Sequence, residues 1–211
     1  MSAYLERAPD AQTVQASGRT LNSGALVDET FELGGYQVEV TRSWPWWSRW
    51  FWEPPRLFRE VYVDFALTNG AEVITGHCTT RGFKAPATRR QLTCSCRDPA
   101  NEVASLELDG PLRALPLTGT ATIAAQAYPA RSYGEPQATH YDLRDAFTVG
   151  EPPVLAVGLA LPGEVWLRPP LSDEVRPAAL CLASALMLYR RRHAHFDGSM
   201  RDSRSPDFDG W

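Results

Sequence analysis

Apolar and polar residues alternate in short segments along most of this chain. In one segment every second position is apolar, namely Val61, Val63, Phe65 and Leu67. Side chains two positions apart in a strand point to the same face. The pattern therefore predicts a strand with one buried and one solvent-exposed face.

Residues that favour turns separate these segments, such as Gly34-Gly35, Asn69-Gly70 and Pro162-Gly163. We predict strands at residues 25–33, 36–42, 59–67, 73–80, 90–97, 103–108, 118–127, 139–144, 154–161 and 164–167. Short strands at this spacing indicate an antiparallel sandwich or barrel.

The segment 178–189 has a different pattern, because it is apolar on every side and Ser184 is its only polar residue. Ser172-Asp173-Glu174 offers an N-cap and acidic residues for a first turn, and Pro177 suits the start of a regular helix. Arg190-Arg191-Arg192 then places cations at the negative end of the helix dipole. We predict a hydrophobic helix from about 173 to 190.

A helix that is apolar all round must be buried all round. Its twelve residues span about 18 Å, well short of the roughly 30 Å of a bilayer core, so its length disfavours a membrane span. A helix laid on one face of a sandwich would carry a polar stripe, and this one has none. The fold that we predict is mainly β, a single antiparallel β-barrel of about ten to twelve strands that encloses this C-terminal helix.

The chain divides into three parts in this interpretation. Residues 1–23 are polar without a sustained period and are expected to form an N-terminal arm, residues 24–190 to form the barrel with its helix, and residues 191–211 to form a polar, disordered tail. With 211 residues, the chain is long enough for one domain with a sizeable core.

Composition and charge limit the classes of partner. A net charge of −4 gives no general attraction to a phosphate backbone, so we expect no nucleic-acid partner. No window reaches about 18 consecutive apolar residues, and the first residues lack the pattern of a secretory signal. We therefore expect a cytoplasmic location, with peripheral association with a membrane as an open alternative.

The order of elements resembles the Tubby C-terminal-like superfamily, which includes phospholipid scramblases and plant LURP-one-related proteins. The residues that carry the resemblance are Tyr141-Asp-Leu-Arg, Val154-Leu-Ala-Val-Gly, Val165-Trp-Leu and Leu171, followed by the hydrophobic helix, with Leu92-Thr-Cys-Ser-Cys-Arg and 103–108 as a middle hairpin. The resemblance implies a closed barrel of about twelve strands around the helix. The family's cluster of Lys and Arg on a loop and its acidic metal segment are both missing, so no lipid site carries over.

The most unusual local feature is a run of aromatic residues between Trp44 and Trp52. The candidate binding residues in it are Trp44, Trp46, Trp47, Arg49, Trp50 and Trp52. Aromatic side chains with a polar atom suit a membrane interface, a sugar platform or a protein interface. Because Pro45, Pro54 and Pro55 make this segment a loop, it either forms a recognition surface or plugs one end of the barrel.

The cysteines leave alternatives open. Cys94 and Cys96 share one face of a predicted strand, and Cys78 lies on the preceding strand opposite Cys94. Cys78 and Cys94 could form a disulfide, or the three cysteines could join His77 in a zinc site. Alternation along one strand makes a poor tetrahedral site, and a reducing cytosol keeps thiols free. We therefore expect Cys78, Cys94, Cys96 and Cys181 to be small hydrophobic core residues, and no metal or other cofactor.

No catalytic group can be nominated from the sequence. The motifs of a nucleophile elbow, a P-loop and a dinucleotide site are missing, and His77, His140, His193 and His195 show no partnered arrangement. The arginines Arg131, Arg144, Arg168 and Arg176 either gather at the barrel rim as an anion site or are scattered on the surface.

Three functions follow from these observations. The first is a non-enzymatic binding module that uses the Trp-rich loop to contact a lipid surface or a protein. The second is a structural or accessory subunit whose loop and tail order only on a partner protein. The third is an enzyme with a site assembled from loops.

Overall fold

The computed structural model describes residues 11–18, 30–43, 58–70, 72–83, 89–111, 117–133, 146–158, 163–168, 171 and 175–196. These residues form twelve strands and one helix. The strands are β1 (Gln12–Ser17), β2 (Thr30–Leu33), β3 (Tyr36–Ser43), β4 (Phe58–Asn69), β5 (Glu72–Phe83), β6 (Arg89–Arg97), β7 (Glu102–Pro111), β8 (Thr118–Ile123), β9 (Gln126–Tyr133), β10 (Ala146–Val149), β11 (Leu155–Gly158) and β12 (Glu164–Leu167). The helix α1 runs from Arg176 to Phe196.

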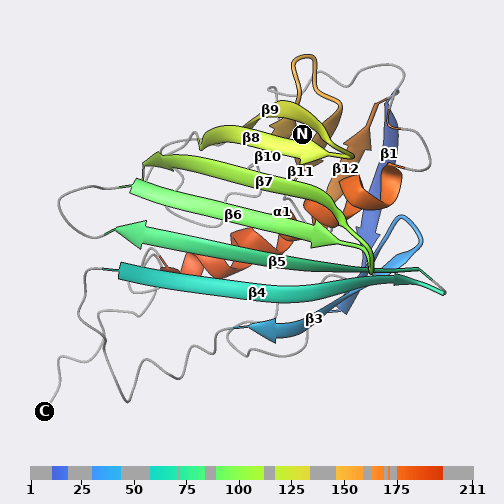
Figure 1. Ribbon diagram of the computed structural model, residues 1–211, viewed down its shortest axis with the longest axis horizontal. Helices are drawn as coiled ribbons and strands as arrows, with labels where there is room; N and C mark the ends of the chain where they lie inside the picture. Colours follow the sequence, from blue (N-terminus) through green and yellow to red (C-terminus); the bar gives the residue numbers. More distant parts are fainter. Residues whose placement is uncertain are drawn as a thin grey trace, which may run out of the picture.

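The strands close into an antiparallel barrel. Each strand pairs with the next one in the chain, and β1 closes the circle by pairing with both β12 and β2. Figure 1 shows the long strands β4 to β7 as a curved wall in front of α1. The predicted fold class, a single antiparallel barrel with a C-terminal helix, is confirmed.

Alternation along the strands places one side chain in two inside the barrel. Val63, Phe65 and Leu67 on β4 are at most 3% exposed, whereas Asp64 and Ala66 between them are half-buried on the outer wall. A side chain at Gly76 would collide with the ring of Phe65, which lies directly across the β4–β5 ladder.

The helix is enclosed as its composition predicts. Every residue from 178 to 188 is buried, and the hydroxyl of Ser184 donates a hydrogen bond to the carbonyl oxygen of Leu180 at 2.9 Å. Contacts reach α1 from β4, β5, β6 and β7, and also from β11 on the opposite side of the barrel. The backbone stays helical as far as Phe196, beyond the predicted end near residue 190.

The N-terminal arm predicted at residues 1–23 is wrong for the part that the structure describes. Strand β1 lies within it and closes the barrel, with Val14 opposite Val165 and Ala16 opposite Leu33. Val14 and Ala16 are buried, and Gln15 between them is exposed. Two apolar residues are too few to establish a period of two in a sequence, although they suffice once both neighbouring strands are in place.

The single strand predicted at 118–127 is also wrong, because a hairpin turn at Ala124 and Ala125 divides it into β8 and β9. Both alanines have positive φ values, 48° and 66°. A two-residue hairpin turn of this type usually carries Asn or Gly, so an alanine pair gives no turn signal. The strand predicted at 139–144 lies outside the described residues, and so do residues 159–161 of the strand predicted at 154–161, of which β11 covers Leu155–Gly158.

The two ends of the barrel differ in the length of their connections. At one end, short turns join β2 to β3, β4 to β5, β6 to β7, β8 to β9 and β10 to β11. At the other end the connections are mostly longer and cover residues 18–29, 44–57, 84–88, 112–117, 134–145 and 159–163. We call these the tight-turn end and the long-connection end.

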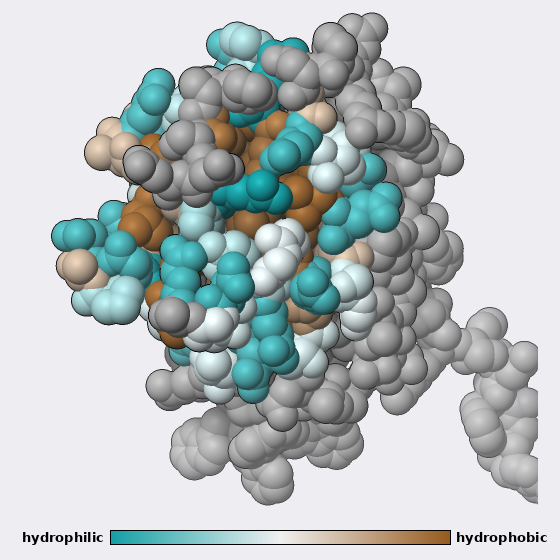
Figure 2. Space-filling view, turned by 90° about the vertical axis from the view of Figure 1, so that its right-hand side faces the viewer, coloured by the Kyte–Doolittle hydropathy of each residue, from teal (hydrophilic) through white to brown (hydrophobic). Residues whose placement is uncertain are grey.

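Figure 2 views the tight-turn end and shows apolar side chains at its centre with polar ones around them. Partly buried apolar residues that pack against the core here are Val103, Val154, Leu171 and Val175. Close to this end, the hydroxyl of Tyr36 donates a hydrogen bond to Glu72 at 2.5 Å. Burial, followed by this bond and the charge of Glu72, raises the pKa of Tyr36 above its ordinary value, so the phenol stays neutral.

Candidate functional site

The barrel interior is already occupied. Side chains of the helix from Ala178 to Leu188 meet the inward-facing side chains of the strands, and together they form the core. A ligand cavity inside a barrel needs space that this helix fills. Candidate sites among the described residues therefore lie on the outer wall and at the two ends.

The predicted Trp-rich site, residues 44–52, lies outside the described residues. The structure does fix where the chain enters and leaves this segment: it leaves β3 at Ser43 and returns at Phe58 of β4, both at the long-connection end. Helix α1 starts at the tight-turn end and runs toward the same long-connection end (Figure 1). Residues 190–192, the three arginines, belong to its last turns.

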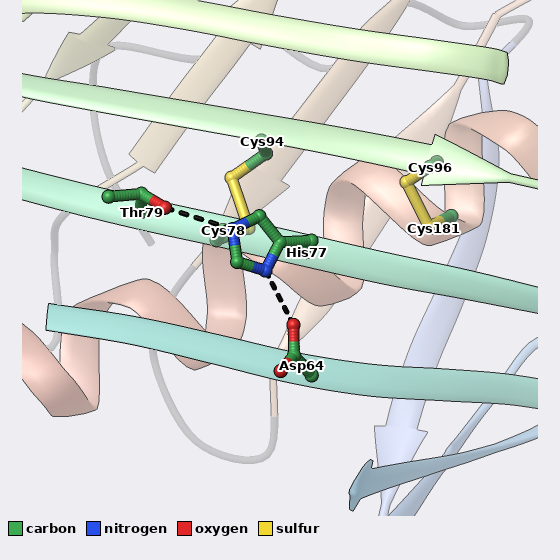
Figure 3. The surroundings of a disulfide bond; sticks show 7 residues. All are labelled: Asp64, His77, Cys78, Thr79, Cys94, Cys96 and Cys181. Atoms are coloured by element: carbon green, nitrogen blue, oxygen red, sulfur yellow. Dashed lines mark hydrogen bonds and ion pairs between the residues drawn. A yellow bond between two sulfur atoms is a disulfide. The ribbon is translucent and has the colours of Figure 1, made fainter. Parts of the chain in front are cut away.

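All four cysteines are bonded in pairs, and so the expectation of free core thiols is wrong. Cys78 pairs with Cys94 directly across the β5–β6 ladder, and Cys96 pairs with Cys181 of the helix (Figure 3). Their Cα atoms lie 4.1 Å and 6.2 Å apart, respectively. These bonds use the sulfur atoms that the zinc alternative required.

Sequence reasoning missed a hydrogen-bonded line of three side chains on the outer wall. Asp64 lies on β4, and His77 and Thr79 lie two residues apart on β5. Oδ1 of Asp64 is 2.5 Å from Nδ1 of His77, and Nε2 of His77 is 3.0 Å from the hydroxyl of Thr79 (Figure 3). The prediction that His77 has no partner is therefore wrong.

The local sequence explains the contact between His77 and Thr79 but not the one between His77 and Asp64. Because side chains two apart on a strand share a face, His77 and Thr79 had to be neighbours once β5 formed. The approach of Asp64 depends on the β4–β5 register, which sets it opposite His77. A hairpin joined at Asn69-Gly70 could have suggested this register, since Asn69 pairs with Glu72.

Of the arginines predicted as an alternative anion site, the three that the structure describes are not all at one end of the barrel. Arg131 lies on β9 toward the long-connection end, whereas Arg168 follows β12 and Arg176 begins the helix, both at the tight-turn end. Arg144 and His140 lie outside the described residues. Arg131 instead lines a surface cavity together with Thr118, Thr148 and Glu151. The cavity has a volume of about 200 Å³, which is smaller than that of typical ligand pockets.

Comparisons with family models, curated proteins and solved structures found no match to this chain. Within the described part of the chain, no helix is long and apolar enough to cross a membrane. The function must therefore be inferred from the chain's own geometry.

Proposed function

We propose that this protein is a binding module whose recognition surface is the long-connection end of the barrel. The observation that carries the proposal is the difference between the interior and the two ends of the barrel. The helix fills the interior, short turns close one end, and the other end carries the long connections, including the Trp-rich segment 44–52. Long loops on a rigid scaffold are where recognition residues concentrate.

The partner that fits this end best is a membrane surface containing anionic lipids. Two features support this partner. The connection from Ser43 of β3 to Phe58 of β4 begins and ends at this end of the barrel and contains Trp44, Trp46, Trp47, Trp50 and Trp52, and α1 runs toward the same end with Arg190-Arg191-Arg192 in its last turns. Tryptophan partitions to the headgroup level of a bilayer, and arginine is attracted to anionic lipid. Peripheral binding requires no spanning helix.

The same architecture supports a family proposal. A closed barrel of twelve strands around a hydrophobic C-terminal helix is what the resemblance to the Tubby C-terminal-like superfamily implies. We propose that the chain is a distant member of that superfamily. Its missing Lys and Arg loop cluster means that lipid recognition here depends on other residues, those of segment 44–52 and the end of α1.

The two disulfides bear on where the protein works. Disulfide bonds persist in oxidising compartments and are rare in the cytosol. Two disulfide bonds would be unusual at the cytoplasmic location that we predicted from the sequence. We propose an oxidising compartment facing a membrane surface.

The test is co-sedimentation with vesicles of phosphatidylcholine alone and of phosphatidylcholine with phosphatidylserine. We expect the wild type to bind the anionic vesicles and Trp46→Ala/Trp47→Ala to bind at least tenfold more weakly, because burying one aromatic side chain contributes roughly 1.5–3 kcal/mol. Val73→Ala is the matched control. It removes an exposed apolar side chain, 41% accessible, from the opposite end and should bind like the wild type.

Equal and negligible sedimentation of all three proteins would remove the lipid proposal and leave a protein partner. Binding that does not depend on phosphatidylserine would contradict the role of the arginines. Binding that the tryptophan substitutions do not weaken would move the recognition surface away from segment 44–52.

A further inference from the structure

We propose that Thr79 is a nucleophile, activated by His77 and Asp64, which reacts with small activated acyl esters on the outer wall of the barrel. The three side chains have the arrangement that such chemistry needs: a hydroxyl within hydrogen-bonding distance of a base, and a third group that orients the base. This activity goes beyond the proposed binding and involves a different surface.

The carboxylate determines the direction of the first hydrogen bond, and the direction of the second holds for the neutral imidazole, the form that can act as a base. An aspartate carboxylate only accepts hydrogen bonds, so Nδ1 of His77 donates to Oδ1 of Asp64. In the neutral imidazole Nε2 then has no proton, and its lone pair accepts from the hydroxyl of Thr79. Nε2 is therefore ready to take the hydroxyl proton, as a general base does.

The strands hold the line in place and leave it open to solvent. In the β4–β5 ladder, Asp64 lies opposite His77 and Tyr62 lies opposite Thr79. The ring of Tyr62 is stacked beside the imidazole, with 6.4 Å between the ring centroids. The side chain of His77 is 53% exposed, so an ester can reach Nε2 and the hydroxyl without any opening of the barrel.

The reaction balances without a cofactor. Oγ1 of Thr79 attacks the ester carbonyl carbon while its proton passes to Nε2 of His77, and the bond to the leaving oxygen then breaks as that oxygen receives the proton. Water next attacks the acyl-threonine and gives a proton to Nε2. The bond to Oγ1 breaks, Thr79 recovers the proton, and the net change is ester plus water to acid plus alcohol.

The same wall limits the substrates. Strand β5 is hydrogen-bonded to β4 on one side and β6 on the other, so its backbone N–H groups are engaged in ladders and cannot stabilise an oxyanion. An outer wall also offers no enclosed pocket for a long substrate. The reaction is therefore restricted to small esters with good leaving groups.

The experiment uses the purified full chain and p-nitrophenyl acetate, followed by release of nitrophenolate and by mass spectrometry of the quenched protein. We expect an acetyl group on Thr79. We also expect Thr79→Val to lower the protein-dependent rate about a hundredfold, because without the hydroxyl the base has no nucleophile to activate and the contribution of general-base catalysis, about 10² at its low end, is lost. The control is Thr93→Val, which removes the neighbouring hydroxyl on β6 opposite Thr79 and should keep the wild-type rate.

Asp64 acts through His77, and so it is a positioning residue. Asp64→Asn should lower the acetylation rate of Thr79 while the melting temperature stays close to that of the wild type, and Asp64→Glu should restore part of the rate. If the contact between Asp64 and His77 were purely structural, Asp64→Asn would lower the melting temperature and leave the acetylation rate of Thr79 unchanged.

Two results would overturn the proposal. If Thr79→Val keeps the rate and His77→Gln loses it, the imidazole reacts alone and Thr79 is a spectator. If the acetyl group lies on another residue, the line is only a stabilising contact between two strands. Neither result affects the binding proposal, since vesicle binding by Thr79→Val is measured separately and should equal that of the wild type.

Discussion

Leu182→Asp is expected to abolish soluble folding. Leu182 is fully buried near the middle of the enclosed helix, and no cation that the structure describes lies beside it to pair with a new carboxylate. A buried carboxyl group without hydrogen-bond partners costs roughly 2–7 kcal/mol even when a proton has neutralised it, and the lost packing of a leucine adds about 2–5 kcal/mol. Together these approach the whole stability of a typical domain, about 5–15 kcal/mol.

Soluble yield and circular dichroism during heating measure this effect. The matched control is Leu182→Met, which keeps the volume and the apolar character and should cost less than about 1.5 kcal/mol. A soluble Leu182→Asp protein that melts like the wild type would mean that α1 lies at the periphery of the barrel.

Removing the Cys96–Cys181 disulfide, which joins α1 to β6, should lower the free energy of unfolding more than removing the Cys78–Cys94 disulfide between β5 and β6. Cys96 and Cys181 are 85 residues apart, and Cys78 and Cys94 are 16 apart. A cross-link restricts the unfolded chain more when its loop is longer, which gives about 4–5 kcal/mol for the first bond and about 3 kcal/mol for the second. The first bond also joins the helix to β6 covalently.

Chemical denaturation of Cys96→Ala/Cys181→Ala and of Cys78→Ala/Cys94→Ala, each under non-reducing conditions, compares the two bonds. Both variants lose similar small side chains from buried positions, so the difference between them reports on the cross-links. Under reducing conditions neither cross-link remains, so the free energies of unfolding of the two variants should differ only by the packing of the replaced side chains. Equal free energies of unfolding in oxidised protein would contradict the expected order.

The parts of the fold that could be predicted are those determined by local patterns. The alternation around Val63, Phe65 and Leu67 was sufficient to place β4, and the uniform apolarity of 178–189 was sufficient to bury the helix. In both cases each residue's environment follows from its own position in a regular element. The enclosure of α1 by the strands could also be predicted, because a helix without a polar face must be covered by other residues on every side.

The parts that could not be predicted depend on residues that are distant in the sequence. Val14 and Ala16 become a strand only between β2 and β12, and the bond of Cys96 to Cys181 depends on where the helix sits along β6. The partner of His77 likewise follows from register. The first two contacts exist only after the barrel closes, whereas the pairing of Asp64 with His77 could be inferred from the sequence only by assuming a tight hairpin turn at Asn69-Gly70.

The central claim is that α1 lies inside a closed barrel, and native-state hydrogen exchange tests it most directly. The amides of residues 178–188 are buried with the strands around them, so they can exchange only when the barrel opens as a whole. We predict that these amides exchange as slowly as those of β5 and β6. Helix amides that exchange orders of magnitude faster, while β5 and β6 remain protected, would contradict the enclosure of the helix.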